Sequence, residues 1–270
     1  MANQKNIIGV MSSTYAYYDL ENMLEGISNA GFKYVELASI LFPGQIYKEH
    51  VFIDSDDAKK SVKLCDKYGI TIIAICAHGR LMKDNAIENF KKCIDMANEL
   101  GVSYICTGTG NVKNKEDKKR FYKEIRVLGE YAANKNINIF LEIHDGWFCN
   151  GKIATEVVKK IGMNNIKINY DTANVIYYGN VRPEEDIKNV INKNLGHVHL
   201  KDKRGGYKVW DFPPLGEGEI NFEVIFNALK NYSGPMCVEI EFDGKRHQLK
   251  KIDNAVKNSY EFLKSYNLIE

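Results

Sequence analysis

Short apolar segments alternate with longer amphipathic segments along the whole chain. In the short segments β-branched and other apolar residues follow one another directly, which is typical of buried strands. In the longer segments apolar residues recur every three or four positions, which indicates helices with one buried face. The short segments predict eight strands, at Ile7–Met11, Tyr34–Leu37, Ile70–Cys76, Ser103–Thr107, Ile137–Ile143, Ile166–Tyr170, His197–Leu200 and Met236–Ile240. The longer segments predict eight helices, at Leu20–Ala30, Asp56–Tyr68, Asn85–Leu100, Lys115–Asn134, Ala154–Ile161, Pro183–Lys193, Phe222–Asn231 and Leu249–Ser265.

This alternation predicts a parallel sheet, because parallel strands need crossover connections and a helix supplies each crossover. The 270 residues are close to the ~250 of a (β/α)₈ barrel, and no linker, low-complexity tract or shift in composition divides the chain. We therefore predict an α/β protein with one domain over residues 1–270, a single (β/α)₈ TIM barrel. An open, doubly wound sheet is the competing architecture.

The last four predicted strands each end in a side chain that can bind a metal ion. Glu142 and His144 end the fifth strand and point the same way, because side chains alternate along a strand. Asp171, His199 and Glu239 end the next three strands. At any single strand a solvated loop start explains such a residue equally well. Four in succession favour a shared site at the C-terminal rim of the barrel, where the active sites of this fold lie.

Three carboxylates in a barrel mouth repel one another unless a cation offsets their charge. Three carboxylates and one imidazole suit a hard or borderline ion, so we expect one divalent ion, with Mn²⁺ favoured over Mg²⁺, Co²⁺ and Zn²⁺. The set contains no cysteine, which argues against a structural zinc site. His197 lies one pleat deeper than His199 and is interpreted as a core histidine, and Glu241 as a solvated residue beyond the rim.

Several segments with these residues resemble the xylose-isomerase-like TIM-barrel superfamily, the sugar phosphate isomerase and epimerase family. That superfamily also includes ketose 3-epimerases, inosose dehydratases and the endonuclease IV class. The resemblance covers nearly the whole chain and is more specific for the superfamily than for a substrate. The segments that carry it best are Phe140–Gly146 (FLEIHDG), Asn169–Asn174 (NYDTAN), Gly196–Asp202 (GHVHLKD), Leu215–Ile220 (LGEGEI) and Gly234–Glu241 (GPMCVEIE).

The resemblance implies that one divalent ion is held by Glu142, Asp171, His199 and Glu239, and that the two glutamates also move the proton. It implies a metal-dependent sugar isomerase or epimerase that works through an enediolate, with a dehydratase of the inosose type as the alternative. The chain has Asn174 where ketose 3-epimerases have a substrate-contacting histidine. It also has Phe148 where they have a glutamate, which puts a free ketohexose substrate in doubt.

An endonuclease-IV-like phosphodiesterase is disfavoured. That pattern has further metal-binding histidines after the seventh strand, and the corresponding loop Arg204–Gly218 contains no histidine.

Further residues near the rim are candidates for substrate binding. The loop after the seventh strand contains Lys201 and Arg204, and a flexible cationic loop there could hold a phosphate or carboxylate; a solvated charge run is the alternative. Glu36 is interpreted as a ligand of a distal hydroxyl or as one half of a buried pair with lysine or arginine. The substrate-binding residues that we predict are His78, His144, Asn174, Lys201, Arg204 and Trp210.

Composition disfavours nucleic acid and membranes as partners, and the resemblance implies a small carbohydrate substrate. The net charge of +2 and the pI of about 8.1 are too balanced for nucleic acid or an anionic membrane as the main partner. No apolar run approaches the ~18 residues of a membrane span, and the N-terminus lacks the features of a signal peptide. Six scattered cysteines without a CxxC motif favour a reduced, cytoplasmic protein. The oligomeric state stays open, a homo-oligomer included.

Overall fold

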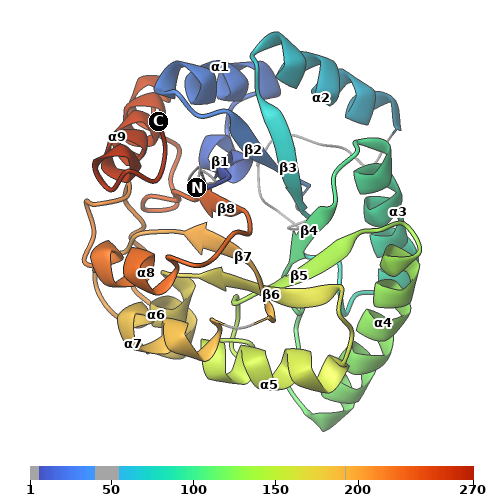
Figure 1. The fold of residues 1–270 in the computed structure, drawn as a ribbon. Helices are drawn as coiled ribbons and strands as arrows, with labels where there is room; N and C mark the ends of the chain where they lie inside the picture. Colours follow the sequence, from blue (N-terminus) through green and yellow to red (C-terminus); the bar gives the residue numbers. More distant parts are fainter. Residues whose placement is uncertain (1–5, 40–54, 192) are drawn as a thin grey trace.

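The eight strands form one closed parallel barrel, in which each strand pairs with its neighbours in the sequence and β1 pairs with β8 (Figure 1). The structure, a computed structural model, describes residues 6–39, 55–191 and 193–270. The predicted (β/α)₈ barrel is confirmed. The strands are β1 (Ile8–Met11), β2 (Tyr34–Ala38), β3 (Thr71–Cys76), β4 (Tyr104–Thr107), β5 (Asn138–Glu142), β6 (Ile166–Asp171), β7 (Leu195–Leu200) and β8 (Met236–Val238).

Helices surround the barrel on the outside, and the main apolar core lies between them and the strands (Figure 1). No helix in the described part of the chain is long and apolar enough to cross a membrane. The α-helices are α1 (Leu20–Ala30), α2 (Ser55–Lys67), α3 (Ala86–Glu99), α4 (Lys115–Ala133), α5 (Gly151–Ile161), α6 (Asn174–Gly179), α7 (Pro183–Asp186), α8 (Phe222–Ala228) and α9 (Leu249–Ser265). Two 3₁₀ turns are η1 (Ser12–Tyr15) and η2 (Ile187–Asn189).

The sixth crossover differs from the predicted single helix at Pro183–Lys193. It consists of α6, α7 and η2, three short pieces in succession. The start of α6 depends on a side chain from the rim: Oδ1 of Asp171 accepts the backbone N–H groups of Ala173 (2.8 Å) and Asn174 (2.7 Å). Because α6 is too short to show a helical repeat of apolar residues, the hydrophobic pattern did not reveal it.

The loop between β7 and α8 is organised around one buried carboxylate. Asp202 accepts four backbone N–H groups: Lys203 (2.8 Å) and Ile220 (3.3 Å) on Oδ1, and Gly216 and Gly218 (2.9 Å each) on Oδ2. A β-carbon on Gly218 would collide with this carboxylate. The backbone of Leu215–Ile220 therefore binds the carboxylate of Asp202, and this contact holds the long loop against the rim.

We expect Gly218→Ala to destabilise the protein by about 1–3 kcal/mol, the usual cost of forcing an extra carbon into a packed site. Thermal unfolding with Gly206→Ala as the control measures it, since a β-carbon on Gly206 meets nothing within 4 Å. Equal melting temperatures for the two variants would contradict the role assigned to Asp202.

Candidate active site

The four side chains expected to hold a metal ion come together inside the barrel mouth. Glu142 and Asp171 are the last residues of β5 and β6, His199 lies in β7, and Glu239 directly follows β8. Each offers a ligand atom, and these atoms all lie within 4.8 Å of one another. All four residues are buried. Asp171 and His199 are also register partners on adjacent strands, which fixes their relative height in the barrel.

Hydrogen bonds aim these side chains at a common point. With Oδ1 of Asp171 occupied by the start of α6, its Oδ2 is left without a hydrogen-bond partner in the described structure. Glu142 accepts the amide of Asn174 on Oε1 (3.1 Å) and contacts Nε2 of His78 through Oε2 (2.9 Å). Nδ1 of His199 lies 3.3 Å from Oε2 of Glu142 and 3.2 Å from Oε2 of Glu239.

Burial and neighbouring charges shift the pKa values of the carboxylates in this cluster in opposite directions. Burial, together with the charges of Glu239 and Glu142, raises the pKa of Asp171 well above its ordinary value, although Lys201 opposes the shift. Burial would raise the pKa of Glu142 as well, but His78 and His199 outweigh it and hold that pKa well below the ordinary value.

The donor set fits a divalent ion. Within the described residues Oδ2 of Asp171 is buried and has no hydrogen-bond partner, while Nδ1 of His199 faces the carboxylates of Glu142 and Glu239. Buried polar atoms are rarely left unpaired, so the free oxygen of Asp171 at this point needs an explanation such as an ion. Carboxylate and imidazole are suitable ligands for a borderline divalent ion.

Lys201 is a buried cation of the site, which corrects the expectation of a flexible loop residue that holds a substrate anion. Its ammonium lies 2.6 Å from Glu241, 3.4 Å from Glu239 and 4.0 Å from Asp171. Burial lowers the pKa of Lys201, but these three carboxylates outweigh burial and raise it well above its ordinary value. The expectation that Glu241 is merely solvated is also wrong, since its side chain is only 28% exposed and pairs with this lysine.

Arg204 does not reach the central cavity, contrary to its predicted role as a substrate-binding residue. Its guanidinium donates to the backbone oxygen of Glu217 (2.9 Å) and lies 3.7 Å from the carboxylate of Asp211. These residues line a separate hollow outside the barrel mouth. The cationic loop is therefore occupied by its own internal contacts.

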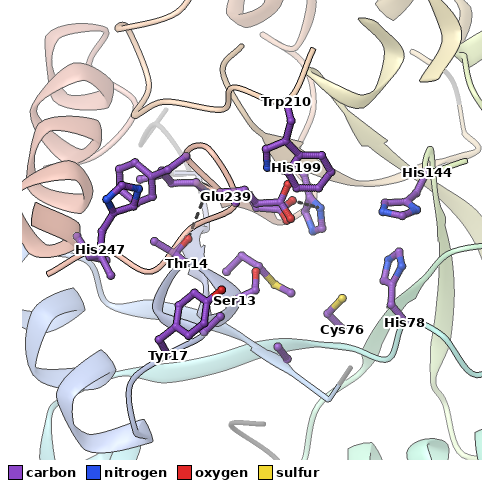
Figure 2. Close-up of a pocket in the computed structure, with 18 of the residues that line it drawn as sticks. Ser13, Thr14, Tyr17, Cys76, His78, His144, His199, Trp210, Glu239 and His247 are labelled. Carbon is purple, nitrogen blue, oxygen red and sulfur yellow. Dashed lines mark hydrogen bonds and ion pairs between the residues drawn. The ribbon is translucent and has the colours of Figure 1, made fainter. Parts of the chain in front are cut away.

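A cavity of about 260 Å³ opens above this cluster, and Glu142, His199 and Glu239 line it. His78 and His144 face each other on one side of it, while Ser13, Thr14 and Tyr17 lie on the opposite side (Figure 2). The lining includes the predicted residues His78, His144 and Trp210, as well as Glu241. It also includes residues that the sequence did not single out, Ser13, Thr14, Tyr17, Tyr178 and His247.

Two of the residues that were missed follow directly from topology. Ser13 and Thr14 come immediately after β1, so they lie on the same rim as the ends of the late strands. That position is the signal that could have found them. Asn174, predicted to bind substrate, instead donates to Glu142 and does not line the cavity.

His144 is a neutral imidazole at the edge of the cavity. Burial, reinforced by the nearby His78, lowers the pKa of His144 to about 4. Its Nε2 lies 3.3 Å from the hydroxyl of Tyr178, and its ring centroid is 5.0 Å from that of His78. The ring of His144 is therefore unprotonated at neutral pH, but a pKa this low makes it a weak base.

The model of the xylose isomerase-like TIM barrel matches residues 24–266 of this chain. The chain belongs to this family. It is similar to the L-ribulose 3-epimerase of Methylomonas sp. (strain DH-1), with 26% identity over 254 residues, 85% of this chain and 81% of that protein. Its fold also resembles two solved structures. One is the IOLI protein with a bound zinc atom (TM-score 0.74, 19% identity, 97% of each chain covered). The other is the probable 3-DHS dehydratase AsbF from Bacillus anthracis (TM-score 0.71, 15% identity, 96% and 98% of the two chains covered).

We expect one equivalent of Mn²⁺ to raise the melting temperature of metal-free protein. An ion bound to the folded state alone stabilises it by about 2.7 kcal/mol at a hundred times its Kd. Asp171→Asn should lose most of this gain, while its metal-free form should be no less stable than the metal-free wild type, because Asn keeps an oxygen for the N–H groups of Ala173 and Asn174 and removes a carboxylate whose charge is disfavoured by burial. Thermal shift and calorimetric titration measure both. An equal gain in the variant would contradict this ligand set.

Asp145, directly after His144, gives a pH-dependent prediction. Burial raises its pKa from 3.8 to about 6. The ionised form is therefore disfavoured in the folded state, and stability falls as pH rises from about 4 to about 6. Asp145→Asn should remove this loss, with a gain of at most about 3 kcal/mol at pH 7.5 and little at pH 3.5, at 1.36 kcal/mol per pKa unit. Urea unfolding of both proteins at the two pH values measures it; equal differences at both would contradict it.

Proposed function

We propose that the chain is a divalent-metal-dependent isomerase or epimerase of a small sugar or keto-sugar. The observation that carries the proposal is the convergence of Glu142 and Glu239, from the ends of β5 and β8, on one point with Asp171 and His199. Glu142, His199 and Glu239 also line the cavity. Family membership and the likeness to an L-ribulose 3-epimerase support a carbohydrate substrate.

In this proposal Glu142, Asp171, His199 and Glu239 hold the ion, with Mn²⁺ favoured. When bound, a divalent ion supplies Lewis-acid polarisation of the substrate carbonyl, which makes the neighbouring C–H more acidic. The zinc atom described for the IOLI protein shows that a relative of this fold takes a divalent ion.

The two glutamates then do the proton chemistry. One removes the proton beside the carbonyl, which gives an enediolate. The other lies on a different side of the cavity and returns a proton to the opposite face of the same carbon, which gives the epimer. Return to the neighbouring carbon instead gives an aldose–ketose isomerisation. His78 and Asn174 hold the carboxylate of Glu142, and Lys201 holds that of Glu239, so each acceptor oxygen is placed before the substrate arrives.

The substrate body would lie between the two walls of the cavity. His78, His144 and Tyr178 offer hydrogen-bonding groups on one side, and Trp210 offers an aromatic face for the carbon-bound side of a sugar. Since Lys201 is neutralised by carboxylates and Arg204 faces another hollow, neither is proposed as a contact for a substrate anion.

The second candidate is a dehydratase. The specific observation is the neutral imidazole of His144, next to Glu142 on the strand face and at the cavity, together with the fold likeness to AsbF. In that reaction the enediolate expels a hydroxyl from the next carbon instead of being protonated again. Keto-inositol and ketose panels, read for loss of water against change of configuration, distinguish the two.

All six cysteines are free thiols and five of them are buried, which agrees with the proposed reduced, cytoplasmic setting.

We expect Glu142→Gln and Glu239→Gln each to lower kcat by ~10²–10⁴-fold even with saturating Mn²⁺, because Gln keeps the shape but loses the basicity. Asp171→Asn should be partly rescued by excess metal, since its defect is in affinity. In D₂O the wild type should exchange the proton beside the carbonyl. If both Gln variants exchange at the wild-type rate, the glutamates are not the bases, and His144 becomes the leading candidate.

A further inference from the structure

Glu36 is a fully buried carboxylate in the interior of the barrel that the proposed chemistry does not use. It lies on β2, on the other side of the barrel from β7. Its Oε2 is 2.8 Å from Nε2 of His197 and 3.2 Å from Nε2 of His199. Its partners are thus two imidazoles rather than the lysine or arginine considered above. A buried charge is costly to retain, so a carboxylate at this position calls for a role.

The two ring nitrogens of His199 face opposite environments. Nδ1 faces the carboxylates of Glu142 and Glu239, at 3.3 and 3.2 Å. Nε2 faces Glu36. A metal ion binds only a nitrogen lone pair, and the partner of the other nitrogen decides which of the two carries the proton. If His199 binds the ion through Nδ1, its proton must therefore be on Nε2. There the N–H can donate a hydrogen bond to the carboxylate of Glu36.

We propose that Glu36 is a positioning residue that holds His199 in the Nε2–H tautomer and turns Nδ1 toward the metal point. His197 anchors the same oxygen of Glu36 from the layer below, so the carboxylate keeps its place when the ring of His199 moves. This inference rests on the proposed metal site and adds to it the group that makes His199 a ligand before the ion arrives.

The amide of Asn169 competes with Glu36 for a hydrogen bond with Nε2 of His199. Its amide nitrogen lies 3.2 Å from Nε2 of His199 and 3.4 Å from Oε2 of Glu142. If this amide donated to Nε2, the ring proton of His199 would be on Nδ1, where it would prevent binding of the ion. The negative charge of Glu36 favours the N–H donor on Nε2, and the amide then donates to Glu142 instead. Glu36→Gln removes that charge and adds a second amide donor, so it should favour the obstructive tautomer.

A deeper ion is the other competing arrangement. Glu36, Cys106, His197 and His199 also offer ligand atoms within 4.8 Å of one another. Glu36 lies at hydrogen-bond distance from both imidazoles, 2.8 Å from Nε2 of His197 and 3.2 Å from Nε2 of His199. An ion there would need the lone pair of Nε2 of His199, so this nitrogen could not then donate a proton to Glu36.

The test is a Co²⁺ titration of metal-free wild type, Glu36→Gln and Glu124→Gln, with optical spectra recorded at each step. Glu124 is a matched control, because it is a buried carboxylate on α4 that pairs with Arg120 outside the barrel. We expect Glu36→Gln to bind Co²⁺ ~10–100-fold more weakly, the usual effect of losing a partner behind a ligand, and Glu124→Gln to bind like wild type. In parallel, ¹⁵N-histidine spectra of Zn²⁺-loaded wild type should show His199 protonated at Nε2, a measurement that does not depend on any variant folding.

The outcomes separate the two proposals. Wild-type protein that binds one ion, with unchanged affinity in Glu36→Gln or with His199 protonated at Nδ1, overturns the role of Glu36 and leaves the metal site standing. Wild-type protein that binds no ion overturns both. A second Co²⁺ with a thiolate charge-transfer band that Cys106→Ala abolishes shows that the deeper cluster is itself a metal site, and also overturns the role of Glu36.

Discussion

The mouth of this barrel depends on how an excess of buried negative charge is offset. Five carboxyl groups converge there, those of Glu36, Glu142, Asp171, Glu239 and Glu241, and all but Glu241 are buried. Lys201 is the permanent cation that contacts this cluster among the described residues, and it is shared by three of the five. Imidazoles contact two more, His78 at Glu142 and both His197 and His199 at Glu36. With one lysine shared by three carboxylates, Oδ2 of Asp171 is left without a hydrogen-bond partner in the described structure, at the candidate metal centre.

Carboxylates near the rim also accept hydrogen bonds from the surrounding backbone, which links the site to the fold. Asp171 uses one oxygen to start α6 and leaves the other for the site. Asp202, three residues after His199, uses both oxygens to hold the loop that brings Trp210 over the cavity. The strand register fixes the heights of Asp171 and His199. Asp171 can therefore hold the start of α6 with one oxygen and face the site with the other. Substitutions here should therefore be judged by stability as well as by rate.

The sequence was sufficient to predict the barrel and the four convergent strand ends, because both follow from periodicity: β–α alternation decides the topology, and strand ends share a rim. It was insufficient where a side chain had a choice of partners. Nothing in the pattern around Lys201 distinguishes a lysine that swings over the cavity from one buried among carboxylates. The difference arises because Glu241 lies on the neighbouring strand's extension, at 2.6 Å. Arg204, only three positions further on, turns outward because its carboxylate partners are Asp211 and Glu217.

The two proposed proton-transfer glutamates are not equivalent, and their surroundings suggest different parts. Both oxygens of Glu142 already have hydrogen-bonding partners, Asn174 on one and His78 on the other. Glu239 has Lys201 beside Oε1 (3.4 Å), and its Oε2 lies 3.2 Å from Nδ1 of His199. The neighbouring cations hold the pKa of Glu239 below its ordinary value and that of Glu142 well below it, so Glu142 is the weaker base. An enzyme that runs a proton in both directions across one carbon can use this difference, since the side with the more basic carboxylate sets which epimer loses its proton more easily.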